Sequence, residues 1–208
     1  MAAACTQKEQ NTYQNPSQNT PSQVNNQESQ INSAPPRVQS IPQEVRDLLG
    51  KSSKVENVYY KYRGPETGTN FFEFYVKGDM VKYLPARQLK ALDQPDSYDS
   101  IIINKTAKTA ASYCLGQTCV YKGKKGDLSY SAVYVPTIYD WFSSLKKAEK
   151  VGEEVIDDRK TWKLDTDQGF MWVDYFYGIP LKIDSNGHIY RFEQLNVKGV
   201  ADSDVNPS

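Results

Sequence analysis

The chain has 208 residues, with 25 Lys and Arg against 25 Asp and Glu, and a single His. This even charge leaves no basic excess to neutralise phosphates, so we expect no nucleic-acid binding. One His disfavours His-based metal sites and catalytic triads, and no apolar run approaches the roughly 20 residues that span a bilayer.

Near the N-terminus, Ala3 and Ala4 precede Cys5, and a tract of Gln, Asn, Ser, Thr and Pro follows to residue 40. Small residues before a Cys resemble the lipobox of secreted lipoproteins, in which the Cys carries lipid. No apolar signal segment precedes Cys5, so Met1-Ala2 is interpreted as an engineered start or a trimmed signal. The alternative is an incidental Cys in a tail. Because residues 1–40 have too few apolar side chains to offset the entropy of ordering, we expect a disordered tether.

The folded part is predicted to span residues 41–200, one ordinary domain, followed by a disordered tail at 201–208. Residues 40–50 favour a short helix, since Ser40 and Gln43 have capping-box spacing and Val45, Leu48 and Leu49 share one face. From residue 55 the apolar period becomes two, which predicts strands with a turn at Gly78-Asp79.

The middle of the chain is predicted to break at residues 85–95, with one helical turn near Leu89 and Leu92, and then to form strands at 98–104, 108–114 and 119–122. Cys114 and Cys119 fit two strands joined by a tight turn, so in an oxidising compartment we expect a disulfide. A reduced cross-strand pair is the alternative. The loop at 123–126 is read as a solvated turn, and residues 128–135 as extended.

Residues 136–148 are the strongest predicted helix. Ile138, Trp141, Phe142 and Leu145 recur at i, i+3, i+4 and i+7. Thr137 and Asp140 are suited to capping its start.

Five further strands are predicted at 150–156, 161–165, 170–175, 180–184 and 188–197, with a type I′ hairpin at Asn186-Gly187. About ten strands follow one another without regular strand–helix alternation. The predicted fold is therefore mainly β (α+β), a strongly curved antiparallel half-barrel with helices covering its concave face.

The stretch from Val173-Asp174 through Gly178, Pro180, Leu181 and Ile183 resembles the strand–Asp–x–x–x–Gly–Leu–Pro hairpin of the LolA/LolB-like superfamily of lipoprotein carriers and RseB-type sensors. The order of elements over residues 41–200 is also similar. The resemblance implies a half-barrel that binds lipids, acyl chains or lipidated proteins. The Cys114–Cys119 hairpin and the 15 tyrosines depart from the family pattern, and the tether suits a lipid-anchored member.

On this resemblance, ten apolar and aromatic side chains are candidates for the lining of a ligand cavity, although a filled core would use the same residue types. They are Tyr60, Phe72, Phe74, Ile138, Trp141, Phe142, Leu145, Leu181, Tyr190 and Phe192.

Signatures of catalysis are not found. Residues 165–169 contain a fragment of a calcium loop without its distal Glu, so a β-turn is the better interpretation. Within each of the pairs Glu153-Glu154 and Asp157-Asp158, the two side chains point to opposite faces. No hydrolase elbow or cofactor motif occurs.

We therefore expect a non-enzyme without a cofactor, and a monomer outside the cytoplasm, anchored in a membrane through Cys5. It would carry or receive a lipid or an acylated protein, with another envelope protein as a further partner. The alternative is an extracytoplasmic protein-binding or sensor module with a packed core.

Overall fold

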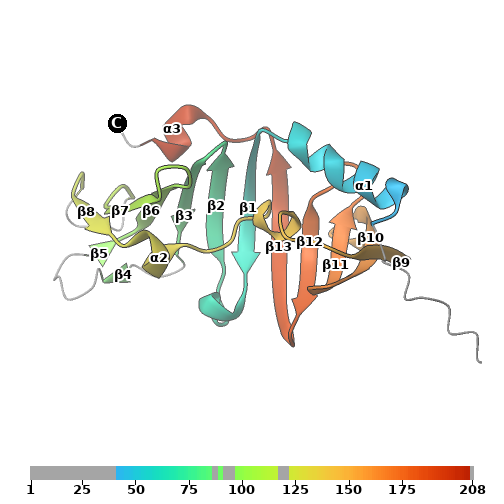
Figure 1. The fold of residues 1–208 in the computed structure, drawn as a ribbon. Coiled ribbons are helices and arrows are strands. Elements are labelled where there is room, and N and C mark those ends of the chain that lie inside the picture. The colour runs from blue at the N-terminus through green and yellow to red at the C-terminus, as the bar shows by residue number, and fades with distance from the viewer. Residues whose placement is uncertain (1–40, 86–88, 91–96, 117–121, 207–208) are drawn as a thin grey trace, which may run out of the picture. The chain divides into compact units, whose positions relative to one another are not determined.

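The computed structural model describes residues 41–85, 89–90, 97–116 and 122–206 (Figure 1). Cys5, the tether and Cys119 lie outside the described residues, so lipidation, the tether's disorder and the disulfide stay predictions. None of the helices in these ranges is long and apolar enough to cross a membrane.

One open antiparallel sheet of eleven strands forms the frame, in the order β8-β7-β6-β3-β2-β1-β13-β12-β11-β10-β9 (Figure 1). Its strands are β1 Asn57–Arg63, β2 Phe72–Lys77, β3 Met80–Leu84, β6 Ser100–Asn104, β7 Thr109–Tyr113, β8 Lys125–Leu128, β9 Ala148–Ile156, β10 Arg159–Thr166, β11 Gly169–Asp174, β12 Pro180–Ser185 and β13 His188–Val197. A separate pair joins β4 Leu89–Lys90 to β5 Ser97–Tyr98. The curved, mainly β architecture predicted from the period-two pattern is confirmed.

The helical elements are short. They are α1 Gln43–Gly50, η1 Lys51–Lys54, η2 Pro65–Thr67, α2 Tyr130–Val133, η3 Asp140–Phe142 and α3 Asp202–Val205.

Helix α1 forms where the sequence predicts it, and it buries Val45 and Leu48 against the sheet. Its first turn follows Pro42, which stands at the N-cap without a side-chain hydrogen bond. The predicted capping box involves Ser40, which lies outside the described residues, so it stays a prediction. Proline suits this end of a helix because its fixed φ is already helical and an N-terminal N–H has no intrahelical partner.

One face of the sheet, here called the inner face, carries the core. Cross-strand pairing aligns Tyr60, Phe74, Tyr83 and Ile101 in one row. A second row joins Leu164, Met171, Ile183 and Tyr190. Because paired residues project to the same side of a sheet, the two rows make one continuous apolar surface.

The predicted helix at 136–148 is wrong. Residues 129–147 cross the inner face in front of β1 and β13 as a largely irregular segment, here called the strap, with only α2 and η3 as single turns (Figure 1). Aromatic and β-branched residues have low helix propensity, and Ile138, Trp141, Phe142 and Leu145 instead pack against the core. The apolar spacing correctly marks buried side chains, but tertiary packing decides the backbone.

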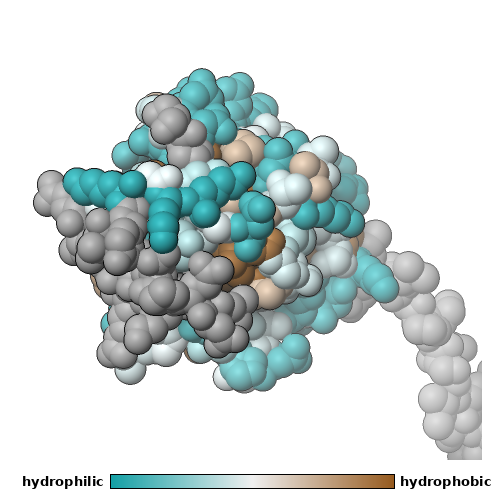
Figure 2. Space-filling view, turned by 90° about the vertical axis from the view of Figure 1, so that its left-hand side faces the viewer, coloured by the Kyte–Doolittle hydropathy of each residue, from teal (hydrophilic) through white to brown (hydrophobic). Residues whose placement is uncertain are grey.

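Other local predictions also change. Residues 128–135 contain α2 rather than an extended segment, Leu89 and Lys90 form β4 rather than a helical turn, and β8 begins at Lys125 inside the predicted solvated loop. The tail contains α3, whose Val205 is 1% exposed, because α3 packs against β2 and β3. Where the described residues are visible at the end of the sheet near β8, the surface is mostly hydrophilic, with one hydrophobic area (Figure 2).

Two turns form as the sequence predicts. Asn186 and Gly187 have φ values of 52° and 78°, as a type I′ hairpin requires. Residues 165–169 make a turn between β10 and β11, in which Asp167 accepts hydrogen bonds from the backbone N–H groups of Lys146 and Lys147 at 3.1 and 3.2 Å. No group of three or more His, Cys, Asp or Glu among the described residues is arranged to hold a metal.

Candidate ligand site beneath the strap

The inner face is an aromatic surface over which the strap lies. The Tyr60 ring stacks on Phe74 at 5.2 Å and meets Phe192 edge-on at 5.6 Å. Tyr83 stacks on both Phe72 and Phe74. Tyr60, Phe74 and Phe192 are fully buried, so in this conformation the rings fill the space that the sequence assigned to a ligand.

The strap contributes the opposite wall. Ile138 is fully buried, and Trp141, Phe142 and Leu145 are partly buried against the core. The Trp141 ring packs on Tyr190 with centroids 4.6 Å apart. Nine of the ten side chains predicted to line a cavity therefore converge between sheet and strap.

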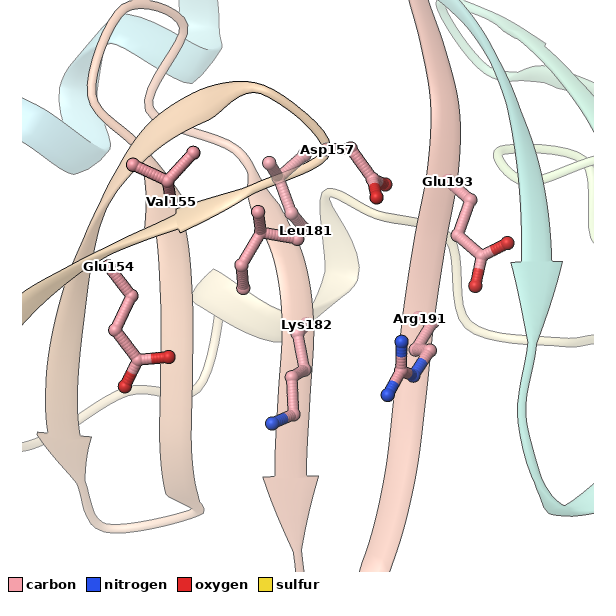
Figure 3. A pocket seen from close by; sticks show the side chains of 8 residues that line it. Glu154, Val155, Asp157, Leu181, Lys182, Arg191 and Glu193 are labelled. Carbon is pink, nitrogen blue, oxygen red and sulfur yellow. The ribbon is translucent and has the colours of Figure 1, made fainter.

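Leu181 is the tenth, and it lies elsewhere. It lines a pocket of about 290 Å³ together with Lys182, Arg191, Glu193 and Glu154. Figure 3 shows Lys182 and Arg191 on the neighbouring strands β12 and β13, with Leu181 beneath the curving β9. A bulge between Trp172 and Val173 shifts the register beside Leu181. The position of Leu181 therefore cannot be predicted from the alternation of side chains between the two faces of the sheet. This polar pocket does not suit an acyl chain.

Polar contacts fasten the strap at a few points. The Tyr83 hydroxyl donates to the Val133 carbonyl at 2.9 Å, the Tyr139 hydroxyl donates to the Val55 carbonyl at 2.9 Å, and the Ile138 N–H donates to the Tyr60 hydroxyl at 3.3 Å. Each of these bonds involves a tyrosine, so the tyrosines have a structural use that the sequence does not reveal.

Asp140 is the charged anchor of the strap. Its carboxylate pairs with Lys105 at 2.6 Å and accepts hydrogen bonds from Thr137 and from the Tyr134 hydroxyl. Burial by itself would raise the pKa of Asp140, but the hydrogen bonds from Lys105, Thr137 and Tyr134 outweigh it and hold the pKa below the ordinary value. The Thr137–Asp140 contact predicted as a helix start forms, and it closes a single turn.

Three buried indole donors, those of Trp141, Trp162 and Trp172, have no acceptor among the described residues, and Trp141 is the one that belongs to the strap. The indole Nε1 of Trp141 makes no hydrogen bond to any described residue. A buried N–H without a partner is unfavourable by about 1–3 kcal/mol. An acceptor brought by a ligand or water would satisfy it.

The Asp–x–x–x–Gly motif builds the turn from β11 to β12. The buried Asp174 carboxylate accepts hydrogen bonds from the N–H groups of Phe176 and Tyr177 at 3.0 and 2.6 Å. Gly178 has φ +69°, and a Cβ there would overlap the Leu48 carbonyl oxygen. The motif residues therefore fix a tight turn against α1.

The sequence matches no protein-family model and no curated protein. Among solved structures, an uncharacterized conserved protein from Thermus thermophilus is similar at a TM-score of 0.47 and 9% identity, with 78% of this chain covering 93% of that one. A chain of the Pseudomonas aeruginosa MucA/MucB complex gives 0.42 and 17%, with 79% of this chain covering 61% of its length. Mycobacterium tuberculosis lipoprotein LppX gives 0.43 and 13%, with 78% and 98% covered.

The likeness is one of structure at low sequence identity, and each of these TM-scores lies below 0.5.

Proposed function

We propose that this protein is a binding module of the cell envelope that takes up a lipid or acyl chain between the inner face and the strap. The observation that carries the proposal is the strap itself. It covers a largely apolar, aromatic sheet face with two single turns and a few side-chain hydrogen bonds. Segments with so little regular structure open at low free energy, so a ligand can take the place of the strap's own side chains.

The unpaired Trp141 donor supports the same proposal. In a ligand-bound state the displaced strap would leave Trp141 beside the ligand, and a carboxylate or ester oxygen would accept its N–H. No catalytic step is proposed: transfer would follow from the difference in affinity between donor and acceptor. Cys5 would hold the domain at a membrane, and the intact mass of the protein from its native host tests for lipid on Cys5.

The test uses a brominated fatty acid, which quenches tryptophan on contact. Purified full-length protein is titrated with the fatty acid, and we expect saturable quenching of Trp141. Trp141→Phe should remove that quenching, whereas Trp172→Phe, on the opposite face of the sheet, should leave it intact. Equal quenching of all variants, or none in the wild type, would count against the proposal. Extraction into organic solvent followed by mass spectrometry reports any lipid carried from the host.

A second function, protein binding with a packed core, is favoured by a different observation. Strand β9 is one edge of the sheet, and its Val151 and Val155 are 52% and 72% exposed. An edge strand offers unpaired backbone groups to an extended partner segment. Val155→Lys should weaken capture of such a partner while leaving fatty-acid quenching unchanged, which separates the two functions.

A further inference from the structure

The turn between β11 and β12 presents three consecutive aromatic residues, Tyr175, Phe176 and Tyr177. Phe176 is 74% exposed and Tyr175 is 44% exposed. The Phe176 and Tyr177 rings meet edge-on with centroids 4.8 Å apart. Large apolar side chains that are exposed together mark an interaction site more reliably than scattered ones.

The turn that carries these rings is held in one conformation. Asp174 binds the N–H groups of Phe176 and Tyr177, and the Gly178 N–H donates to the Asp174 carbonyl at 2.9 Å. Gly178 itself lies against the Leu48 carbonyl of α1. Because the aromatic tip is already ordered, little conformational entropy is lost when it binds a partner.

Lysines surround the aromatic tip. A pocket of about 440 Å³ beside Phe176 and Tyr177 is lined by Lys51, Lys54 and Lys198. Its remaining lining is Val55 and Val197, so no carboxylate of the described residues lines it. None of the three lysines forms an ion pair with a described residue.

Two further cations stack on the same rings but are already paired. Arg159 lies 5.6 Å from the Tyr177 ring and Lys160 lies 5.2 Å from the Tyr175 ring. Arg159 pairs with Asp174, and Lys160 pairs with Glu153. The uncompensated positive charge at the turn therefore comes from Lys51, Lys54 and Lys198.

We propose that this aromatic–lysine patch docks the domain on an anionic phospholipid bilayer. Aromatic side chains favour the headgroup level of a bilayer, and lysines near an anionic leaflet are attracted to its phosphates. In the docked state Phe176 enters the boundary between headgroups and acyl chains, and the three lysines contact phosphates. The contact does not need the strap to open, so it is independent of ligand uptake. A single lipid chain anchors only marginally, and this patch would supply a second attachment.

The experiment is flotation of the full chain, without lipid on Cys5, with vesicles of phosphatidylcholine alone or mixed with phosphatidylglycerol. We expect binding only to the mixed vesicles and loss of binding at high NaCl, because salt screens exposed charges. Replacing Lys51, Lys54 and Lys198 by Gln should weaken binding about tenfold or more, since each lysine near an anionic surface contributes on the order of 1 kcal/mol. Phe176→Ser should also weaken it several-fold, because it removes the apolar insertion.

Matched controls make the same change in net charge, or remove an equally exposed apolar side chain, away from the patch. The exposed lysines Lys108, Lys125 and Lys146, replaced together by Gln, and Val155→Ser should each leave binding within about twofold of the wild type. Equal losses in the control triple variant would show a non-specific charge effect and overturn the proposal. Wild-type binding by Phe176→Ser, or full competition by inorganic phosphate, would replace a bilayer site with a site for a free anion.

Discussion

Single residues fix the β11–β12 turn through two different constraints. Asp174 supplies acceptors for backbone donors that would otherwise be unpaired, and Gly178 adopts a positive φ against the backbone of α1. A short polar acceptor and a residue without Cβ are the chemical requirements at these positions. The same two residues hold the aromatic tip in place for docking.

Gly178→Ala is expected to destabilise the protein more than Gly187→Ala. Both glycines have positive φ, at 69° and 78°, but a Cβ at Gly187 meets nothing within 4 Å. The control therefore reports only the left-handed strain of about 1–2 kcal/mol. At Gly178 the new Cβ also overlaps the Leu48 carbonyl oxygen, so we expect a loss of about 3 kcal/mol or more.

Urea unfolding of both variants measures the difference. Equal destabilisation would mean that α1 shifts freely away from the turn, contrary to the close packing described above.

At the scale of elements, the strap is an irregular segment packed against the core, and the proposed ligand uptake depends on its opening. It joins β8 at one end of the sheet to β9 at the other. Its side chains occupy the apolar face, while its backbone relies on Tyr60, Tyr83, Tyr139 and Asp140 for fastening. Such a segment is stable when closed and needs few bonds broken to open.

Asp140→Asn is expected to loosen the strap without unfolding the sheet. It removes the pair with Lys105, so we expect a loss of about 1–3 kcal/mol. Amide hydrogen exchange should become faster in residues 129–147 and stay unchanged in β1, β2 and β13. The control is Asp127→Asn, at a side chain that is 92% exposed. It should leave amide exchange unchanged both in the strap and in β1, β2 and β13. Unchanged exchange in the strap would contradict its dependence on Asp140.

The same residue gives the strap a pH dependence in acid. Because the folded pKa of Asp140 lies below its ordinary 3.8, its stabilising contribution is present above about pH 4 and is lost as the pH falls through the folded pKa. In the Asp140→Asn variant, the loss of stability at low pH that comes from protonation of Asp140 should disappear.

The whole molecule has an unusual concentration of tyrosine in its interior. Burial raises the pKa of Tyr60, Tyr62, Tyr83, Tyr134 and Tyr139 above the ordinary value of 10.0. In the unfolded chain these groups lose their protons near pH 10. The folded state keeps them, so the free energy of unfolding must decrease as the pH rises above 10.

Alkaline titration followed at 295 nm is the measurement. We expect these five of the 15 tyrosines to stay protonated in the native protein above pH 10 and to ionise together with cooperative unfolding. In denaturant all should titrate near the ordinary value. Ionisation of every tyrosine near pH 10 without unfolding would show that the core is open to water.

The sequence by itself determined where most of the strands lie and that apolar residues alternate with polar ones along them. Period-two alternation identified β1, β2, β3 and β9 to β13, because in-and-out projection along a strand is a local property. The hairpin at Asn186-Gly187 was also predicted from the backbone preferences of its own residues, and the hairpin after Asp174 was predicted from its resemblance to a family motif. The spacing of Ile138, Trp141, Phe142 and Leu145 marked a buried stretch correctly.

The tertiary structure decided the features that the alternation of apolar and polar residues along a strand does not predict. It made residues 136–147 part of the strap rather than of the helix predicted at 136–148, because packing against the aromatic face outweighs a weak helical tendency. It placed Leu181 in a polar pocket through a bulge, and it brought Lys51, Lys54 and Lys198 around the aromatic turn from two distant segments of the chain. Local spacing fixes which side a residue faces, whereas the neighbours it meets there depend on how distant strands are joined.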